Sequence, residues 1–512
     1  MTRLAAFFLV LLALALGMDR SLGLYDEGVI LTGAMRAAAG DVPHAGFYTN
    51  YGPGVFYPIA ILFRLFGETV WVERLYDTAI RAGIVMMAYA LVAGVAPRRI
   101  AVAVAAASFL WVLGIGFYGY PLFPVTLLAL LAAALIQPAL VGDAAARRLF
   151  FAGAVVALAA LTRYDVGFVL FIGLGVSLAA AKQWRAVAMY IVGTAVLFLG
   201  AVAVYASFAP LGPFWHDIFL FSIPNYAPMR SLPFPGLQEI RREPENIAVY
   251  TTIVTCIALV ALLATDRRGF AARSRAHWLA LTFTVLATLF YMKGLVRVSP
   301  IHLMSSIFAS LIALGAIAHV GWIRGGGPRV AVAILALAAA IPALQSTASA
   351  VVERAARHRF GFTLLSLKCL TPPEMFDRVG CFMVDSDRLQ AYAAVARNTA
   401  PGERVFVGLG RHDKIHVNDV LSYFAMGRMP ATRWHHFDSG LQTSEPIQRE
   451  MVRELESLKV RFVILETTWD HIAEPNGSGI SSDVRVLDDY LRARYRAVAQ
   501  FGEVYVLERS AP

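Results

Sequence analysis

Residues 22–33, LGLYDEGVILTG, place two adjacent acids, Asp26 and Glu27, shortly after an apolar run at 4–20. A chain that leaves a membrane at this point is still close to the lipid headgroups. Acids in the first turn of a helix are stabilised by the helix dipole, and apolar residues follow the pair at the spacing of one helical face. The stretch therefore predicts an amphipathic helix whose acids either begin the helix or serve a site at the membrane surface.

The composition of the whole chain sets its class. Of its 512 residues, 58% are hydrophobic and 16% are charged, and the mean hydropathy is +0.61. An ordinary soluble domain carries about 25% charged residues, so we predict a polytopic α-helical membrane protein. The net charge of +10 lies in short arginine clusters between apolar runs and not on a stripe interleaved with aromatic residues. We therefore expect no nucleic-acid partner.

Apolar segments recur along the first two thirds of the chain, and a helix needs about 20 such residues to cross a bilayer. We predict about 11 transmembrane helices, at 4–20, 77–95, 100–117, 121–140, 149–162, 166–181, 186–207, 247–264, 277–292, 302–319 and 329–346. The first segment is also short enough for a cleaved signal peptide. We favour an uncleaved helix.

Basic residues indicate the orientation of these helices. With a cytoplasmic N-terminus, every basic cluster falls on the cytoplasmic side, as the positive-inside rule requires. The clusters lie at Arg3, 98–99, 147–148, 182–185, 265–275 and 324–329. An odd number of spans then places the C-terminal region outside the cytoplasm. The arginine- and alanine-rich composition is typical of a GC-rich bacterial genome, so we predict a multi-pass protein of the bacterial cytoplasmic membrane.

Three parts of the chain differ in composition. Residues 1–346 form the predicted transmembrane domain, which includes a first outer loop at 21–76, and residues 347–379 form a connection. Residues 380–512 form a small extracytoplasmic α/β domain, because runs rich in β-branched and aromatic residues alternate with segments of helical periodicity. The strand-like runs are 404–409, 461–466 and 496–509, and the helical segments lie near 386–398, 446–458 and 484–494.

The three cysteines show no CxxC or zinc-type spacing. Cys369 and Cys381 both lie near the entry to the C-terminal domain, outside the cytoplasm in the predicted topology. An oxidising compartment permits a disulfide between them, and two free thiols remain the alternative.

The interiors of the predicted helices contain almost no ionisable residue, whereas acids and polar residues gather in the outer connections. A transporter generally needs charged groups near the bilayer midplane. Neither GxGxxG nor GxxxxGK[ST] occurs between a strand and a helix, so we expect no nucleotide site. The pattern favours chemistry at the outer face over transport of a lipid-linked saccharide.

The segment after the acidic pair, GDVPHAGFYTNYGPGVFYPIAILFRLFGETVWVERL at 40–75, is aromatic and punctuated by proline and glycine. It is typical of a segment that lies in the membrane interface. The order of apolar helix, DE, GD-x-P, aromatic interfacial segment, LFGE and ERL resembles the first outer loop of the C-superfamily (GT-C) membrane glycosyltransferases. These enzymes use polyprenyl-phosphate-linked sugars, and they include aminoarabinose transferases and protein O-mannosyltransferases. The resemblance covers residues 1–185 best and extends loosely to RVSPIHLMSSIFASLIAL at 297–314.

The resemblance implies an inverting sugar transfer to an extracytoplasmic glycan, lipid or protein, in contact with membrane lipids. The first acid of the family's DE pair is catalytic, and it matches Asp26. A carboxylate in a partly buried setting suits the role of general base. Glu27 is a candidate for orienting the acceptor or binding a cation, and a capping or solvated role is the alternative.

The leaving polyprenyl phosphate needs cations at the membrane face. Arg163 in TRYD and Arg297 in VRVSP lie at outer ends of predicted helices, where a guanidinium can bind phosphate oxygens in a bidentate way. Lys293, His302 and Asp165 complete the candidates for substrate binding. Interfacial anchoring is the competing explanation for each cation.

The chain departs from the family at NYGPG, residues 50–54. Several family members have an acidic-basic-Pro-Pro sequence there, and Tyr51 occupies the position of their phosphate-contacting lysine. We therefore count Tyr51 among the substrate-binding residues and expect another cation, Arg163 first, to bind the phosphate.

The C-terminal domain holds two polar stretches, GRHDKIHVND at 410–419 and RWHHFDSG at 433–440. Their imidazoles and carboxylates are possible metal ligands, but scattered loop residues are commoner, so we predict no metal or other cofactor. Two further functions remain open besides glycosyl transfer. They are a transporter or flippase of lipid-linked saccharides and a non-catalytic component of envelope-glycan assembly.

Overall fold

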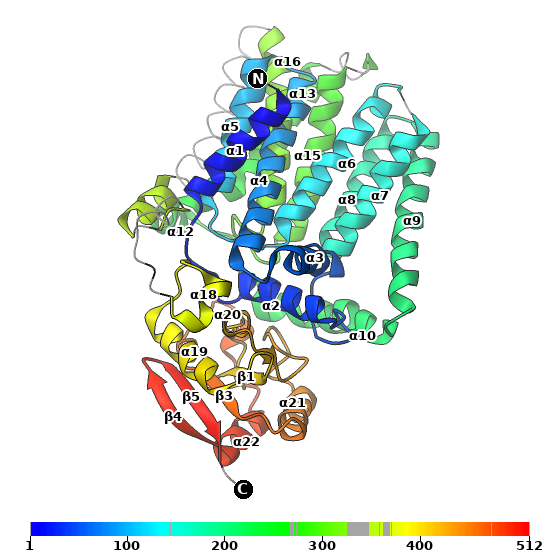
Figure 1. Ribbon diagram of the computed structural model, residues 1–512. Helices are drawn as coiled ribbons and strands as arrows, with labels where there is room; N and C mark the ends of the chain where they lie inside the picture. The colour runs from blue at the N-terminus through cyan, green and yellow to red at the C-terminus, as the bar shows by residue number, and fades with distance from the viewer. Residues whose placement is uncertain are drawn as a thin grey trace.

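The computed structural model consists of a helical bundle above a smaller domain that contains a sheet (Figure 1). It describes residues 2–143, 145–266, 268, 271–272, 274–324, 348–357, 359–361, 369, 371–472 and 474–510. The predicted span at 329–346 lies outside the described residues.

Ten of the predicted apolar segments form helices. They are α1 (Arg3–Gly17), α4 (Val70–Ala93), α5 (Arg98–Gly114), α6 (Leu122–Leu140), α7 (Ala146–Thr162), α8 (Tyr164–Ala180), α9 (Trp184–Ala206), α13 (Thr251–Thr265), α15 (Arg275–Gly294) and α16 (Met304–Arg324). Among the described residues, five helical segments are long and apolar enough to cross a membrane: α4, α6, α9, the segment Glu245–Thr265 and residues Met304–Gly321 of α16. The chain is thus a membrane protein of mostly helical structure with a small C-terminal sheet domain.

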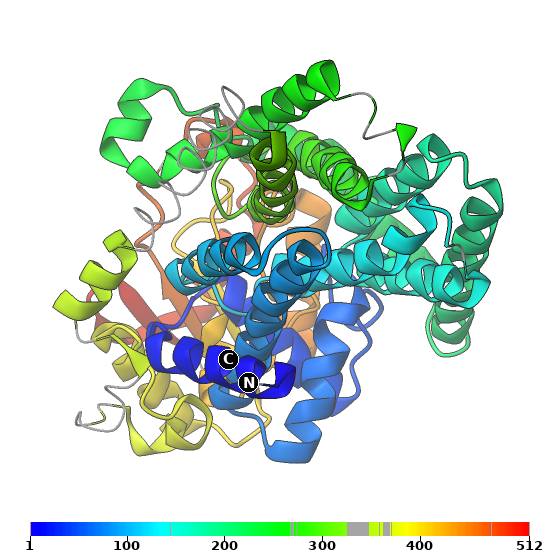
Figure 2. The ribbon, with the colours of Figure 1, turned by 90° about the horizontal axis from the view of Figure 1, so that it is seen from above.

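The bundle packs in two groups around a shared apolar core. α7 packs on α6, α8 and α9, and α15 packs on α16 and α13. The view from above shows α7, α8 and α9, coloured cyan to green, along one side (Figure 2). On α9, Val196, Leu199 and Val204 are exposed, as expected for side chains that face lipid.

The loop predicted to be the first outer one, residues 21–76, contains two helices that lie across the lower end of the bundle, α2 (Asp26–Ala39) and α3 (Phe56–Phe66), with a short 3-10 turn at Pro53–Val55 before α3 (Figure 1). One side of α3 is exposed and apolar, with Ile61, Leu65 and Phe66. This arrangement fits the interfacial segment that the sequence predicts.

The second long outer connection is folded into short elements that continue below α9. They are α10 (Leu211–Trp215), a π-helical turn at His216–Phe221, α11 (Ser222–Arg230), α12 (Leu237–Arg242) and a 3-10 segment at Pro244–Tyr250. α11 matters most for the site, because it ends at Arg230.

The C-terminal domain has a five-stranded sheet of order β2-β1-β3-β5-β4. β1 (Arg404–Leu409) pairs in parallel with β2 (Met429–Pro430) and β3 (Phe462–Glu466), whereas β5 (Val504–Arg509) pairs antiparallel with β3 and with β4 (Tyr495–Phe501). The domain's helices are α18 (Pro373–Val379), α19 (Ser386–Asn398), α20 (Leu421–Met426), α21 (Glu445–Ser457) and α22 (Val486–Arg494), with a 3-10 turn at Gly477–Gly479. The strands and helices predicted for this region are confirmed, whereas β2, α18 and α20 were not anticipated.

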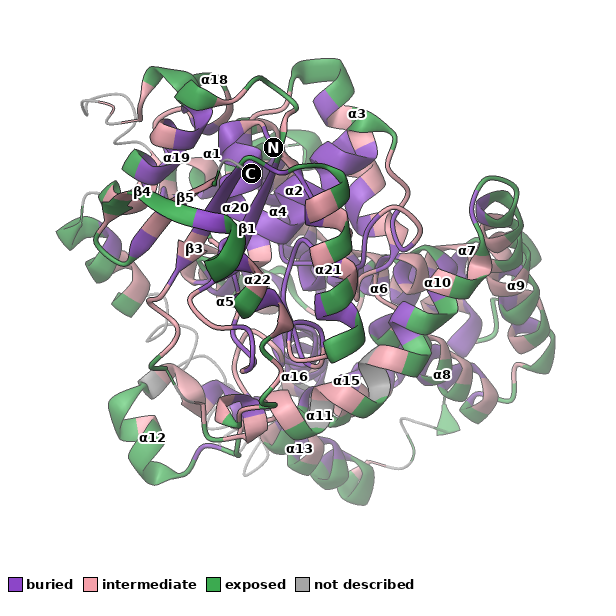
Figure 3. Cartoon of the chain, turned by 90° about the horizontal axis from the view of Figure 1, so that it is seen from below, coloured by how far each residue is buried: buried purple, intermediate pink, exposed green. Residues whose placement is uncertain are grey.

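α2 joins the two parts of the molecule. Gly28 faces α20 so closely that a Cβ atom there would collide with the backbone of Leu421. The Leu421 N–H donates to Leu24 O (2.9 Å), and Thr32 Oγ1 donates to Val420 O (2.9 Å). Seen from below, α2, α20 and β1 are largely buried, whereas β4 is largely exposed (Figure 3). The helix that begins with the acidic pair is therefore held between the bundle and the C-terminal domain.

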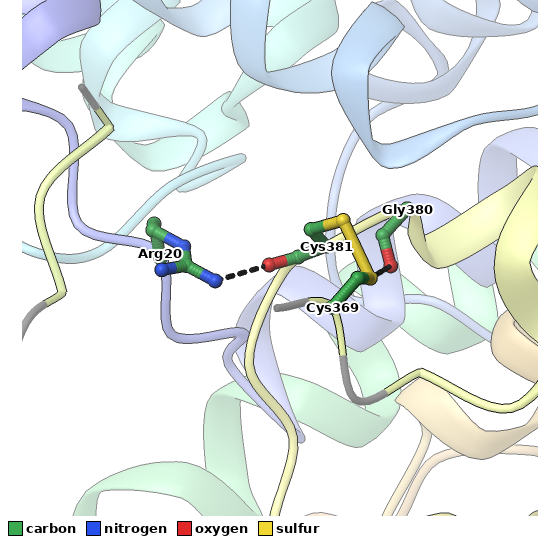
Figure 4. The surroundings of a disulfide bond; sticks show 4 residues. All are labelled: Arg20, Cys369, Gly380 and Cys381. Carbon is green, nitrogen blue, oxygen red and sulfur yellow. Dashed lines mark hydrogen bonds between the residues drawn. A yellow bond between two sulfur atoms is a disulfide. The ribbon is translucent and has the colours of Figure 1, made fainter. Parts of the chain in front are cut away.

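A disulfide joins Cys369 to Cys381, with their Cα atoms 5.1 Å apart. Arg20 Nη2 donates to the carbonyl oxygen of Cys381 (2.7 Å) (Figure 4). Two residues further on, Met383 pairs with the extended segment before α2, because Leu22 N donates to Met383 O (3.1 Å) and Met383 N donates to Arg20 O (2.8 Å). The disulfide thus lies beside the strand-like segment that leads into α2.

α4 departs from the prediction that the helix interiors contain almost no ionisable residue. Its first half carries Glu73, Arg74, Asp77 and Arg81, each buried. Arg81 pairs with Asp77 and donates to the carbonyls of residues 112 and 115 at the end of α5 (2.7 Å each). These charges lie at the end of α4 nearest α2, where Arg81 satisfies carbonyls that the end of α5 leaves unpaired.

Candidate active site

Asp26 is the first residue of α2, and the segment before it is held in place from two sides. Arg20 N donates to Arg359 O (2.8 Å) on one side, and Leu22 pairs with Met383 on the other. Asp26 itself is half-buried, and it lines two adjacent cavities. The rigid approach to α2 fixes where its carboxylate lies.

Glu27 has a different environment from its neighbour. Arg74 Nε and Nη2 donate to the two Glu27 carboxylate oxygens (2.6 and 2.9 Å), and Gly23 N donates to Oε2 (2.7 Å). Arg74 also donates to the carbonyls of Asp19 (2.7 Å) and Ser21 (2.6 Å). Both oxygens of Glu27 are therefore engaged in fixing the start of α2, and this geometry favours a positioning role over contact with the acceptor.

The smaller cavity, of about 200 Å³, brings Asp26 together with cations. Arg230 and Arg297 line it, and they come from two connections that are far apart in the sequence. Its walls are completed by Tyr25, Val29, Asn50, Tyr51, Phe117, Tyr120, Tyr226, Ile301, His302, His436 and Asp438. We call this space the cationic cavity.

Carboxylates of the C-terminal domain hold the two arginines. Arg297 Nη1 and Nη2 donate to the Glu474 carboxylate (3.0 and 2.6 Å), and Arg297 Nη1 also donates to Arg230 O (2.8 Å). Arg230 forms longer ion pairs with Asp438 (3.6 Å) and Glu474 (3.7 Å), and its Nε has no hydrogen-bond partner among the described residues. Arg230 therefore has donor capacity left for an anionic ligand.

Burial raises the pKa of Asp26 to about 6. Arg230 opposes this rise, Asp438 adds to it, and Arg297 and Arg163 oppose it more weakly. Desolvation thus outweighs the attraction of the arginines, because burial deprives the charged form of the carboxylate of part of its hydration. A carboxylate with this pKa is largely deprotonated at pH 7 and can still accept a proton, which is what a general base requires.

The predicted cation Arg163 lies behind the wall of the cationic cavity. Its guanidinium carbon is 5.6 Å from the centroid of the Tyr51 ring, and its Nε and Nη2 donate to the two Asp165 oxygens (3.1 Å each). Lys293 Nζ is 2.8 Å from Asp165 Oδ2. Asp165 therefore pairs with both cations, and Arg163 lies beside Tyr51, which lines the cavity, without lining the cavity itself.

The position of Tyr51 follows from the glycine after it. Gly52 N donates to Thr162 O (3.1 Å), and a Cβ atom at Gly52 would collide with Leu161 O. This close approach leaves no room for a side chain at residue 52, which is a steric reason for the first glycine of NYGPG.

His302 is the remaining predicted residue. Its Nδ1 lies 2.6 Å from Ser299 Oγ. Burial, followed by the nearby Arg297, lowers the pKa of His302 to about 3. The imidazole is therefore neutral at physiological pH and contributes no charge to the cavity.

Sequence reasoning missed Arg230 and Glu474, and it noted Asp438 only as one of the polar residues of 433–440. Arg230 belongs to the connection between the predicted spans 186–207 and 247–264, which strict alternation places on the same side as Asp26, and this was the one signal available for it. The polar stretches of the C-terminal domain are largely buried, and His412 Nδ1 lies 2.6 Å from Asp488 Oδ1. Among the described residues, no group of three His, Cys, Asp or Glu side chains could hold a metal ion.

The chain combines a helical bundle, an acid-bearing loop between its first two long helices, and a C-terminal α/β domain below the bundle. Solved structures with this fold match the chain nearly end to end. ArnT from Cupriavidus metallidurans in the apo state has 13% sequence identity and a TM-score of 0.60, with 99% of this chain and 96% of that chain covered. ArnT from the same organism bound to undecaprenyl phosphate has 13% identity and a TM-score of 0.51, with 99% and 97% covered.

The oligosaccharyltransferase of Archaeoglobus fulgidus, solved as a complex with Zn and sulfate, has 10% identity and a TM-score of 0.50, with 91% of this chain and 68% of that chain covered. No protein-family model and no curated protein sequence matches the chain. At these identities the likeness establishes the fold, and the GT-C resemblance found in the sequence is confirmed at that level.

Proposed function

We propose that this protein is a glycosyltransferase that moves a sugar from a polyprenyl-phosphate donor to an extracytoplasmic acceptor, with Asp26 as general base. The observation that carries the proposal is the cationic cavity, where a carboxylate with a raised pKa meets Arg230 and Arg297 at the membrane face. The fold supports the same class, since one neighbour with this fold is ArnT bound to undecaprenyl phosphate.

In the proposed reaction, the Asp26 carboxylate takes the proton of an acceptor hydroxyl. The acceptor oxygen attacks the anomeric carbon of the donor sugar and forms the new glycosidic bond. The bond between the anomeric carbon and the phosphate oxygen breaks, and its electron pair leaves with the polyprenyl phosphate. Attack from the face opposite the leaving group inverts the configuration at the anomeric carbon.

Arg230 and Arg297 would stabilise the phosphate, both before transfer and as it gains charge on leaving. A guanidinium can donate two parallel hydrogen bonds to phosphate oxygens. Arg163 and Lys293, each paired with Asp165, add positive potential from behind Tyr51. In this proposal the predicted cations have two roles, since Arg297 lines the cavity and Arg163 supports it from outside the lining.

Binding of undecaprenyl phosphate to the purified protein in nanodiscs tests the donor half of the proposal. A hydrogen bond to a charged group contributes about 1.5–3 kcal/mol, which is about 10-fold to 150-fold in affinity. We expect Arg230→Gln and Arg297→Gln each to weaken binding by at least about tenfold. Arg147→Gln is the matched control, because Arg147 lies at the opposite end of α7 from Arg163. Unchanged binding in both cavity variants would contradict the proposal.

The transporter alternative gains one observation, the buried charges of α4. They pair with each other and with carbonyls near α2, which argues for a structural role. Transport without transfer would appear as movement of a lipid-linked saccharide across vesicles, with no donor consumed.

A further inference from the structure

A second and larger cavity, of about 450 Å³, also reaches Asp26. It shares Tyr25, Asp26 and Phe117 with the cationic cavity, and its other walls come from different parts of the chain. They are Asp19 and residues 21–24 and 27 before and in α2, Gly114, Gly116 and Tyr118 at the end of α5 and after it, Ala350, Glu353, Arg354 and Arg359 of the connection, and Val417, Asn418 and Trp469 of the C-terminal domain. We call it the outer cavity. Its volume suits a small-molecule or saccharide-sized ligand.

The two arginines that line the outer cavity, Arg354 and Arg359, are both engaged by the segment before α2, although Arg354 Nε has no hydrogen-bond partner among the described residues. Arg359 Nε and Nη2 donate to the Asp19 carboxylate (3.0 and 2.8 Å). Arg354 Nη1 and Nη2 donate to the carbonyls of Gly17 (2.9 Å) and Gly114 (3.1 Å), and its Nε is 3.5 Å from Asp19 Oδ2. Both arginines therefore serve the fold of the segment before α2.

The acids of this cavity outnumber its arginines. Glu27 is neutralised by Arg74, and exposed Glu353 lies 3.2 Å from Arg359. Asp26 has no such partner in the outer cavity, so an incoming phosphate or carboxylate would meet net repulsion. In the cationic cavity two arginines, Arg230 and Arg297, face two acids, Asp26 and Asp438, so its lining has no such excess of acids. The two cavities that meet at Asp26 therefore differ in how strongly they disfavour an anionic ligand.

Trp469 indicates what kind of uncharged ligand fits. Its side chain is half-buried, and its indole Nε1 is buried without a hydrogen-bond partner among the described residues. A buried indole N–H usually has a partner, so this one has a donor available for a ligand. The same cavity presents Tyr25, Phe117 and Tyr118. Carbohydrates offer both an apolar C–H face, which packs on aromatic rings, and oxygens that accept from an N–H.

We infer that the outer cavity binds the acceptor, that the acceptor is an uncharged carbohydrate, and that Trp469 contacts it so that one hydroxyl reaches Asp26. This inference rests on the proposed function, because it assigns the second substrate of the same reaction. A phosphorylated lipid and a peptide are the alternatives that the test must separate.

Saturation-transfer NMR on the protein in nanodiscs loaded with undecaprenyl phosphate tests this inference. The probes are mannobiose, maltose and di-N-acetylchitobiose as neutral saccharides, mannose 6-phosphate as an anionic one, and a short serine- and threonine-containing peptide. We expect signals from at least one neutral saccharide and none from the sugar phosphate or the peptide. Trp469→Ala should reduce the saccharide signal at least fivefold, and Trp469→Phe should retain part of it because the aromatic face remains.

Trp184→Ala is the matched control, because Trp184 is an exposed tryptophan on α9 outside both cavities. Undecaprenyl phosphate should bind equally well to the wild type and to all three tryptophan variants, which also verifies that they are folded. The inference is overturned if the sugar phosphate or the peptide gives the stronger signal, or if no saccharide signal depends on Trp469. Failure of the proposed function would instead appear as absent undecaprenyl phosphate binding or absent donor consumption in the wild type.

Discussion

The ionisation of Asp26 predicts how the rate of transfer depends on pH. A base must be deprotonated to act, so activity should rise with pH through the pKa of Asp26, which burial raises to about 6. With this pKa, about nine tenths of the molecules carry the carboxylate at pH 7 and about one tenth at pH 5. We therefore expect kcat/KM to fall about tenfold from pH 7 to pH 5. An aspartate with an ordinary pKa would lose less than about 10% over the same range.

Two substitutions should shift the midpoint of this fall in kcat/KM in opposite directions along the pH axis. Arg230 lowers and Asp438 raises the pKa of Asp26. Arg230→Gln should therefore shift the midpoint to higher pH, and Asp438→Asn should shift it to lower pH. His302 and His436 do not titrate in the pH range of the assay, because burial lowers the pKa of each to about 3.

The assay is the initial rate of radiolabelled sugar transfer from a polyprenyl-phosphate sugar between pH 4.5 and 8, at subsaturating acceptor. The donor is a phosphodiester, which has already lost its only acidic proton in this range. A flat profile from pH 5 to 7 would refute the assignment of the raised pKa to the catalytic base. A midpoint that moves in the same direction in Arg230→Gln and in Asp438→Asn would also refute this assignment.

Two predictions concern the framework of the site. Arg74→Met removes the partner of buried Glu27, and breaking a buried ion pair costs about 3–5 kcal/mol, so thermal unfolding in detergent should occur at a clearly lower temperature. A variant as stable as the wild type would contradict the positioning role of this pair. Replacing Cys369 and Cys381 by serine should lower stability by about 3 kcal/mol and abolish the effect of dithiothreitol on Tm, whereas Cys256→Ser should leave that effect intact. Equal Tm values for the oxidised and reduced wild type would show that the disulfide does not brace this region.

The fold was largely predictable because its signals are local. Apolar runs of bilayer length, short basic clusters, and β-branched runs such as 404–409 and 461–466 each reveal one element without reference to the rest of the chain. The structure places helices or strands at these positions. The same reasoning overlooked the charges of α4, because a window average of hydropathy hides Asp77 and Arg81 among apolar neighbours.

The site was only partly predictable because it is assembled from distant segments. Asp26 could be found from its neighbours in sequence. Arg230, by contrast, meets Asp438 and Glu474 across more than 200 residues, and no local pattern reports such a contact. Nor could the sequence separate Asp26 from Glu27 in role. That distinction needs Arg74, which engages one acid and leaves the other facing the cavities.

Donor consumption by Asp26→Asn tests the central claim most directly. The substitution preserves the size of the side chain and removes the base, and a positioned base contributes about 10²- to 10⁴-fold to the rate. Asp489→Asn, an exposed acid on α22, serves as the matched control. With a panel of polyprenyl-phosphate sugars and purified membranes, we predict transfer from one donor by the wild type and the control, and a loss of at least about 100-fold in Asp26→Asn. Transfer at the wild-type rate by a folded Asp26→Asn protein would contradict the account.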